Sequence, residues 1–247
     1  MTNCRTIFMK TESSFFVKLL ATKLPNRLDE FRLNELISLV SLQRKSRASK
    51  FKFIEDIYQS LTGEILLRYG LQNKIGFNPD HLHFSYNSYG KPVLSGIENI
   101  DFSISHSGNW VIVGLSERAI GVDTERIHNV DTGIADLYFS EEECKIVKSC
   151  SDRRTLMETF YRIWTLKEAY IKAIGKGLSC PLSTFTVIPG VSGVSLKLSD
   201  QVLPRMFLKE YDLDPEYKCA VCCEIDSLPA EISIIKFETL VAEVKTY

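Results

Sequence analysis

The stretch that most limits what this chain can fold into is residues 162–178, which read RIWTLKEAYIKAIGKGL. On a helical wheel its apolar residues share one arc, while Glu168 and Lys172 lie on the opposite side, as in an amphipathic helix. That arc consists of Ile163, Leu166, Ala169, Tyr170, Ala173 and Ile174. Gly175 can take the left-handed conformation that ends helices, and Pro181 prevents the helix from resuming. The sequence therefore predicts a helix with one buried face and one charged face.

Glu168 and Lys172 stand one helical turn apart near the end of this predicted helix. The simplest explanation is a solvent-exposed ion pair, which stabilises a helix by roughly 0.2–0.5 kcal/mol. A functional role for the pair requires further chemistry-bearing residues elsewhere in the chain. The segments upstream of the helix supply them.

The size of the chain allows one large domain or two small ones. It has 247 residues, of which 45% are hydrophobic and 11% aromatic, enough for a substantial core. The formal net charge is -1, so no general attraction to nucleic acid or to an anionic membrane is expected. No signal peptide, and no apolar run as long as a membrane span, is evident in the sequence. We therefore expect a cytoplasmic protein without membrane or nucleic-acid partners.

The cysteines indicate reduced thiols. They are Cys4, Cys144, Cys150, Cys180, Cys219, Cys222 and Cys223. An odd number without a signal peptide argues against a disulfide framework. Three of them lie in the apolar, strand-like run YKCAVCCEI, and no second pair of zinc ligands stands at finger spacing. We interpret these three as buried core residues, since free cysteine is among the most buried residue types.

The N-terminal third predicts a strand over residues 5–10, then helical material up to residue 40 with a break at Pro25. A basic run, RKSRASKFK, occupies residues 44–52. Its cations are Arg44, Lys45, Arg47, Lys50 and Lys52. Such a run is either a solvated surface, an anion-binding patch or a nucleic-acid arm, although the last usually has interleaved aromatic residues. The run opens or precedes a long core helix that is expected to end near Gly70.

Three strand-like segments follow in the middle of the chain. In residues 101–108, DFSISHSG, apolar residues alternate with serines as in a half-buried strand, and His106 near its end has a structural explanation as readily as a functional one. Residues 110–115 and 119–125 read as two strands joined by a short turn, which predicts a β-hairpin. Asp123 and Glu125 on the second of these strands point to the same face. Two carboxylates placed in this way suit Mg²⁺, although an Asp-x-Glu pair alone is common.

The remaining segments complete a mixed pattern. Ser140 followed by Glu143 reads as a capping box that opens a helix ending near residue 148. Between Pro181 and Ile225 the sequence reads as four strands, and the tail, residues 231–247, alternates and then becomes helical. Helices and strands that are mixed in this way predict an α/β (α+β) fold.

In combination, these motifs closely resemble the 4′-phosphopantetheinyl transferases of the surfactin-synthetase-activating (Sfp) type. The motifs are G-V-D-x-E at residues 121–125, W-T-x-K-E-A-x-x-K at 164–172, Y-G-K-P at 89–92 and S-x-S-H-S at 103–107. Each motif is weak alone, but the set in this order and spacing is specific. The resemblance covers residues 42–224.

The resemblance implies transfer of 4′-phosphopantetheine from coenzyme A to a serine of an apo carrier protein, with release of adenosine 3′,5′-bisphosphate. It also implies a monomeric pseudo-dimer of two similar subdomains, each a small, mainly antiparallel sheet packed with helices, with the active site in the cleft between them. The subdomains would be residues 1–119, which contact coenzyme A, and 120–247, which carry the metal and catalytic motifs. The expected carriers are peptidyl and acyl carrier domains, including those of nonribosomal peptide synthesis.

The resemblance also implies residue roles. The implied Mg²⁺ ligands are Asp123, Glu125 and Glu168, and the implied catalytic residues are Glu168, Lys172 and Asp123. Glu168 is the candidate base for the carrier serine, and Lys172 stabilises charge on the phosphate or the leaving group. Coenzyme A contacts are implied for Arg44, Arg47, Lys91, Ser105, His106 and Lys172. Glu143 falls where the family often has an acidic residue near the metal, and its capping role explains it equally well.

One position departs from the family pattern. Gln59 stands where an arginine is typical, in an R-x-L-x-G motif that is expected to hold the 3′-phosphate of coenzyme A. Glutamine can donate a hydrogen bond but carries no charge. Discrimination against dephospho-coenzyme A would therefore need a charge from another residue, for which Lys50 and Lys52 are the candidates.

Two other functions use some of the same residues. A Mg²⁺-dependent hydrolase of nucleotide pyrophosphates would need the same carboxylates, with water as the nucleophile. A non-catalytic module would instead use the basic run to bind RNA or an acidic partner. Neither explains why all four motifs occur together in this order.

Overall fold

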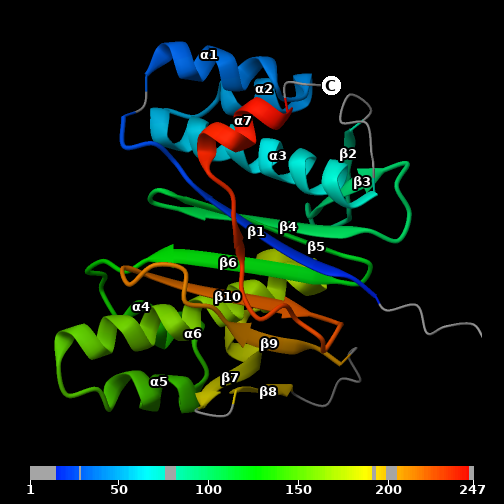
Figure 1. Cartoon of the computed structure of the whole chain (residues 1–247). Helices are drawn as coiled ribbons and strands as arrows, with labels where there is room; N and C mark the ends of the chain where they lie inside the picture. Colours follow the sequence, from blue (N-terminus) through cyan, green and yellow to red (C-terminus); the bar gives the residue numbers. More distant parts are fainter. Residues whose placement is uncertain (1–14, 28, 76–81, 191–192, 199–204, 245–247) are drawn as a thin grey trace, which may run out of the picture.

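The computed structural model describes residues 15–27, 29–75, 82–190, 193–198 and 205–244 (Figure 1). The strand predicted over residues 5–10 lies outside these ranges. The elements from β1 to β5 are called the first half below, and those from β6 to β10 the second half.

The first half begins and ends with a strand. In chain order its elements are β1 (Val17–Lys23), α1 (Glu30–Ser38), α2 (Leu42–Ala48), α3 (Ile54–Ile75), β2 (His83–Tyr86), β3 (Pro92–Ser95), β4 (Asp101–Ser107) and β5 (Trp110–Ser116). β1, β5 and β4 form an antiparallel sheet in that order, and β2 and β3 form a separate hairpin. Apolar residues of α3 pack on one face of the sheet, as amphipathic helices do.

The second half repeats this arrangement. Its elements are β6 (Ile120–Arg126), α4 (Ile134–Tyr138), α5 (Glu141–Lys148), α6 (Arg153–Ile174), two short 3₁₀ turns (Gly177–Ser179 and Leu182–Thr184), β7 (Phe185–Gly190), β8 (Gly193–Leu198), β9 (Phe207–Glu210) and β10 (Tyr217–Cys223). β6, β10 and β9 form an antiparallel sheet in that order, β7 and β8 form a hairpin, and α6 packs on the sheet.

The two halves pack sheet against sheet, with helices on the two outer sides (Figure 1). The core between the sheets includes Leu19 of β1, Ile112 of β5, Ile120 and Val122 of β6 and Val221 of β10. Each sheet thus buries one face against its long helix and the other against the second sheet. The predicted fold class, two similar subdomains built of small antiparallel sheets and helices, is confirmed.

The predicted β-hairpin over residues 110–125 is wrong. β5 pairs with β1 and β4, whereas β6 pairs with β10, so the turn after β5 carries the chain from one sheet to the other. Both strands were predicted correctly, but their pairing was not. A short turn between two apolar strands favours a hairpin from local sequence alone, and the partner of β6 lies nearly a hundred residues further along the chain.

Side chains of β4 bind the backbone of β6 across the junction. The backbone N–H groups of alternate β6 residues donate to alternate side chains of β4: Ile120 to Asp101, Val122 to Ser103, Thr124 to Ser105 and Arg126 to Ser107. The donor–acceptor distances lie between 2.8 and 3.3 Å. These donors lie on the edge of β6 that none of the described strands pairs with, where unpaired backbone groups are costly. The serines of β4 therefore fix the register between the halves.

Three element boundaries differ from the sequence analysis. β1 occupies part of the region predicted as helical; its buried run VKLLATK lacks the alternation of a half-exposed strand. α3 continues past Gly70 to Ile75, and a Cβ at Gly70 would lie 2.6 Å from a side-chain carbon of Leu115, so the glycine permits close packing of helix on sheet. α6 starts at Arg153 rather than at residue 162, with Asp152 as its N-cap.

Other predictions are confirmed. α6 ends at Ile174 with Gly175 in the left-handed conformation, at φ 68°. The basic run precedes the core helix, because α2 is a separate short helix before α3. The four strands between Pro181 and Ile225 are β7 to β10. The three cysteines of β10 are buried, which raises the pKa of each thiol.

The tail returns to the first half. The short strand β11 (Ser233–Ile234) pairs with β1, and helix α7 (Phe237–Val244) packs in the same core as α3. Residues 231–247 were expected to belong to the second half, whereas β11 and α7 pack on the first half. Within the described ranges, no helix combines the length and apolar character needed to span a membrane.

Candidate active site

Two carboxylates of β6 are held by serines of β4. Ser105 Oγ donates to Asp123 Oδ1 at 2.9 Å, and Ser107 Oγ donates to Glu125 Oε2 at 2.7 Å. The same serine oxygens accept the backbone N–H groups of the next β6 residues, so each hydroxyl is fixed on both sides. Asp123 is 2% exposed. The register between β4 and β6 therefore determines where both carboxylates point.

Helix α6 brings Lys172 to Asp123. Lys172 Nζ lies 2.6 Å from Asp123 Oδ1 and 3.1 Å from Ser105 Oγ. Lys172 thus forms its ion pair with Asp123 across the two halves, and not the solvent-exposed pair with Glu168 that was the simplest explanation of their spacing. Gly121 makes it possible, because a Cβ there would lie 2.0 Å from the carbonyl oxygen of Ala169. The backbone of α6 can approach β6 only where that strand has no side chain.

The three acidic side chains share one electrostatic environment. Burial raises the pKa of Asp123, and the charge of Lys172 opposes this only in part. Burial and the negative charge of Asp123 raise the pKa of Glu125 to about 7. Burial and the charge of Asp123 also raise the pKa of Glu168. The site thus concentrates negative charge that the nearby lysine does not fully compensate.

The chemistry of this site fits a divalent cation. Asp123 Oδ2 is buried without a hydrogen-bond partner, which is unusual for a carboxylate oxygen. Carboxylates are the ligands that Mg²⁺ prefers, and it completes its octahedron with water and phosphate oxygens. In the part of the chain that the structure describes, no three His, Cys, Asp or Glu side chains already converge as a metal cluster. The donor set fits Mg²⁺ bound by few protein ligands.

Glu143 lies apart from these carboxylates in a buried ion pair. Its Oε1 accepts from Lys167 Nζ at 2.6 Å and from the backbone N–H of Val187 at 2.7 Å, and its Oε2 accepts from Ser140 N at 2.8 Å. Both charged side chains are 0% exposed. The predicted capping box is present. Of the two explanations for Glu143, the structure supports the capping one.

A cavity of about 300 Å³ lies between the halves, next to Lys172. Its walls come from α2, the start of α3, the β2–β3 turn, β4 and the end of α6. The basic residues that line it are Arg44, Arg47, Lys91, His106 and Lys172. The positive charge of the arginine and lysine side chains among them makes the cavity suited to an anionic ligand.

His106 opens onto the cavity and is neutral near pH 7. Partial withdrawal from water, together with the positive charges of Lys172 and Arg44, lowers the pKa of the ring to about 4. Arg44 is held in place by Glu64, with Nε 3.2 Å from Oε2, and by the hydroxyl of Ser60. A bound phosphate would stabilise the charged form of His106.

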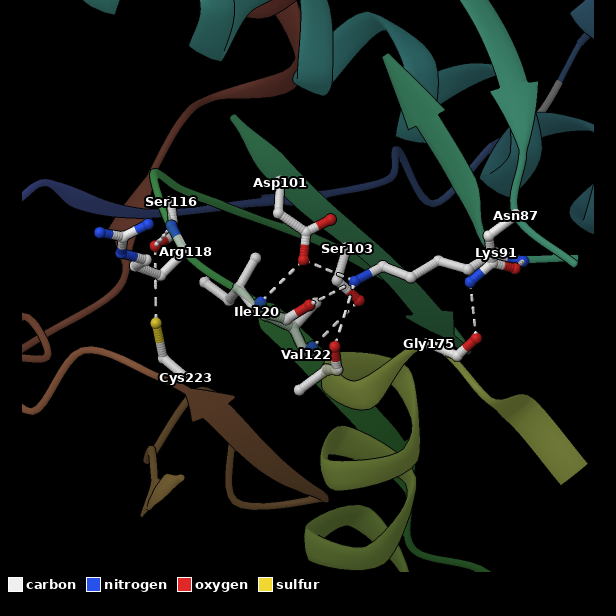
Figure 2. A network of polar contacts seen from close by, with 11 residues as sticks. Asn87, Lys91, Asp101, Ser103, Ser116, Arg118, Ile120, Val122, Gly175 and Cys223 are labelled. Atoms are coloured by element: carbon white, nitrogen blue, oxygen red, sulfur yellow. Dashed lines mark hydrogen bonds and ion pairs between the residues drawn. The ribbon is translucent and has the colours of Figure 1, made fainter. Parts of the chain in front are cut away.

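Gln59 also lines the cavity, but its amide is engaged. Its Nε2 donates to the carbonyl oxygen of Gly108 in the β4–β5 turn at 2.8 Å. Lys91 is engaged as well, with Nζ 2.6 Å from Asp101 Oδ2 and 3.2 Å from the carbonyl oxygen of Ile120 (Figure 2). Both residues connect elements of the fold at the wall of the cavity.

The predicted site residues therefore form two adjoining groups. One contains Asp123, Glu125, Glu168, Lys172 and Ser105, and the other lines the cavity with the five basic residues named above. Sequence reasoning missed Ser107 and the scaffold role of Asp101. The signal was present, since Asp101, Ser103, Ser105 and Ser107 alternate along one strand, but a half-exposed strand explains that alternation equally well.

The sequence matches two family descriptions that divide it at nearly the same point as the two halves. Residues 28–118 match "4′-phosphopantetheinyl transferase, N-terminal", and residues 119–222 match "4′-phosphopantetheinyl transferase superfamily".

Curated relatives are similar over most of their length. The chain is 36% identical to the 4′-phosphopantetheinyl transferase ffp of Bacillus subtilis, covering 86% of this chain and 95% of the relative. It is 34% identical to the transferase Sfp of Bacillus subtilis strain 168, covering 83% and 91%. It is 33% identical to the transferase gsp of Aneurinibacillus migulanus, covering 90% and 92%. The chain belongs to the 4′-phosphopantetheinyl transferase superfamily.

Proposed function

We propose that this protein transfers 4′-phosphopantetheine from coenzyme A to a serine of an apo carrier protein, releasing adenosine 3′,5′-bisphosphate. The observation that carries the proposal is the position of the basic cavity beside the buried carboxylates, with Lys172 belonging to both. A nucleotide with a phosphate and a pyrophosphate needs such a cavity, and phosphoryl transfer needs groups that stabilise charge next to it.

The first half would bind the nucleotide. Arg44, Arg47 and His106 face the cavity and would contact the phosphates, while Lys91 and Ser105 would act from its edge. Arginine suits this role because its planar fork binds phosphate oxygens in pairs. In this division of the chain, residues 1–119 contact coenzyme A and residues 120–247 carry the chemistry, with the tail packed on the first half.

The second half would perform the transfer. The carrier serine oxygen attacks the phosphorus next to pantetheine, a new P–O bond forms, and the bond from that phosphorus to the bridging oxygen breaks. Glu168 is the candidate base for the serine proton, because its raised pKa makes the carboxylate a better proton acceptor. Lys172 would stabilise the negative charge on the departing bisphosphate.

We propose Asp123, Glu125 and Glu168 as the residues that hold Mg²⁺. When bound, the ion would act as a Lewis acid that neutralises charge on the pyrophosphate. Ser105 and Ser107 would keep the two β6 carboxylates oriented, since each donates to one oxygen and leaves the other available.

We further propose that the enzyme works as a cytoplasmic monomer on peptidyl or acyl carrier domains. Both walls of the cavity come from one chain, so a second copy is not required to build the site. The six described cysteines are free thiols, which suits a reducing compartment.

The test is the intact mass of an apo peptidyl carrier domain after incubation with the protein, coenzyme A and Mg²⁺. We expect a gain of one phosphopantetheine group, absent without Mg²⁺ and absent with Glu168→Ala. An apo acyl carrier protein is assayed in parallel while adenosine bisphosphate is quantified. Release of the bisphosphate without any carrier would instead identify a hydrolase, and no modification of either carrier would overturn the proposal.

A further inference from the structure

The turn between β2 and β3, residues 87–91, contacts the C-terminal end of α6 in the other half. Asn87 Nδ2 donates to the carbonyl oxygen of Gly175 at 2.8 Å, and Lys91 Nζ lies 3.5 Å from the carbonyl oxygen of Ala173. Figure 2 shows both side chains reaching from the turn, Asn87 towards Gly175. The last carbonyls of a helix have no partners within it, so external donors satisfy them. The turn therefore caps the helix that carries Lys172.

Asn87 can do this because its other amide atom holds the turn. Its Oδ1 accepts from the backbone N–H of Tyr89 at 2.9 Å and of Lys91 at 2.8 Å. An asparagine side chain that folds its own turn in this way is fixed in orientation. Its NH₂ group is then left to donate outward, to the end of α6.

Lys91 ties four elements together. The third acceptor of its ammonium group, besides Asp101 and the carbonyl of Ile120, is the carbonyl of Ala173. An ammonium group has three N–H donors, so each has an acceptor within the protein. Asp101 also accepts the backbone N–H of Ile120 at 2.8 Å, so the start of β6 is held at both its N–H and its carbonyl. The network joins the β2–β3 turn to β4, β6 and α6.

The close approach depends on Gly175. Its φ of 68° is a conformation that side chains disfavour. A Cβ there would lie 3.0 Å from Asn87 Nδ2 and 3.1 Å from a side-chain carbon of Lys91. The end of α6 can therefore lie this close to the turn only because residue 175 has no side chain. Gly175, Lys91 and Lys172 all line the cavity, so the contact also forms part of its wall.

We propose that Asn87 is a positioning residue for the transfer reaction. It holds the end of α6 against the first half so that Lys172 keeps its place between Asp123 and the cavity. The inference rests on the proposed function. Its physical basis is that catalytic groups on one half must be aligned with a nucleotide held by the other, and misplacement by about 1 Å can cost on the order of a hundredfold in rate.

The decisive variant is Asn87→Asp. Aspartate has the same shape and still accepts both N–H groups of the turn, but in place of the NH₂ it presents an oxygen that repels the carbonyl of Gly175. We expect kcat to fall about tenfold, with KM for coenzyme A changed less than about threefold. Hydrogen exchange should become faster over residues 170–177 and stay unchanged in the core of the first half.

Asn99→Asp is the matched control. Asn99 lies in an exposed turn with φ 59°, a conformation that aspartate tolerates, and it does not line the cavity. The substitution makes the same chemical change and adds the same charge. We expect kcat, KM and exchange over residues 170–177 to equal those of the wild type.

Each other result would overturn the proposal. Wild-type kcat in Asn87→Asp, despite faster exchange at the helix end, would exclude a positioning role, and unchanged exchange would exclude the cap itself. Faster exchange throughout the first half would make Asn87 a general stability residue. A wild-type protein that modifies no carrier would overturn the proposed function instead, and the exchange comparison would still test the cap.

Discussion

The two halves of the molecule share one topology but not one chemistry. Apart from β11, which extends the first sheet, the order β1-β5-β4 corresponds to β6-β10-β9. The first residue of β1 pairs with the last of β5, as the first residue of β6 pairs with the last of β10. Both long helices, α3 and α6, have 22 residues. Corresponding positions can therefore be compared directly.

The acidic side chains of the candidate site all lie in the second half. Leu20 of β1 takes the place that Asp123 takes in β6, and Thr22 takes the place of Glu125. On the helices, Tyr69 and Asn73 stand where Glu168 and Lys172 stand. The first half thus keeps the scaffold with apolar or neutral residues at these places. The fold alone does not make the site; four side chains of the second half do.

A second difference concerns buried charge. Arg68 of α3 and Lys167 of α6 occupy the same place, and each pairs with a buried glutamate that also binds the N-cap of the preceding short helix. In the first half the glutamate, Glu64, lies on the long helix and has Arg44 as a second cation. In the second half Glu143 lies on the short helix, with Lys167 as its cation. The buried glutamate of the first half therefore keeps a second cation, Arg44, if Arg68 is removed.

The largest expected effect is on kcat, and it distinguishes Asp123 from its counterpart Leu20. Asp123→Ala should lower kcat by about a thousandfold, because it removes a proposed Mg²⁺ ligand and the partner that holds Lys172 in place, while the fold is retained. Leu20→Ala should do the reverse, costing about 2–5 kcal/mol of unfolding free energy through a cavity but leaving the kcat of the folded protein unchanged. Carrier modification and urea unfolding measure both variants. Substantial activity in Asp123→Ala would contradict the assignment.

The next largest effect distinguishes the two buried ion pairs by how much each contributes to the free energy of unfolding. Lys167→Met leaves Glu143 buried without its cation and should cost about 3–5 kcal/mol of unfolding free energy. Arg68→Met should cost less, because Glu64 keeps Arg44. Denaturant unfolding of both variants provides the comparison. Adding Glu143→Gln to Lys167→Met should restore part of the lost unfolding free energy. An equal loss in Arg68→Met and Lys167→Met would contradict the idea that Arg44 compensates for Arg68.

The third prediction concerns His106, which the first half contributes to the site. The free protein has a lowered pKa of about 4 at this ring, so it is neutral near pH 7. Adenosine 3′,5′-bisphosphate should raise the pKa above about 6.5, because its negative charges favour the protonated ring. The ligand should therefore bind more tightly as the pH falls through this range. An NMR titration can follow the four histidines, with His106→Gln to assign the signal; an unchanged pKa would remove the ring from the phosphate site.

The sequence predicted the local structure of the second half well. The amphipathic pattern and Gly175 defined the end of α6, and the spacing of Ser140 and Glu143 defined the start of α5. Asp123 and Glu125 were expected to share a face, which follows from strand geometry alone. These features depend on neighbours in sequence. The resemblance to a family then supplied the roles that spacing could not.

What the sequence did not reveal depends on long-range contacts. The pairing of β6 with β10, the serines of β4 that bind β6, and the cap of Asn87 on α6 each join residues far apart in the chain. Lys172 bonds to Asp123 rather than to Glu168 for the same reason. Local periodicity gives the face on which a residue lies but not what that face meets.

The smallest expected effect tests whether Thr22 is only the neutral counterpart of Glu125. Its side chain is fully buried, and its Oγ1 has no hydrogen-bond partner in the structure. Thr22→Val keeps the shape and removes a hydroxyl that loses its water on folding, so it should stabilise the protein by about 1 kcal/mol and leave transfer unchanged. Glu125→Gln, at the corresponding place in β6, should lower transfer because it removes a proposed metal ligand. Thermal unfolding and carrier modification distinguish the two, and a destabilised Thr22→Val would mean that the first half also uses a polar group at this position.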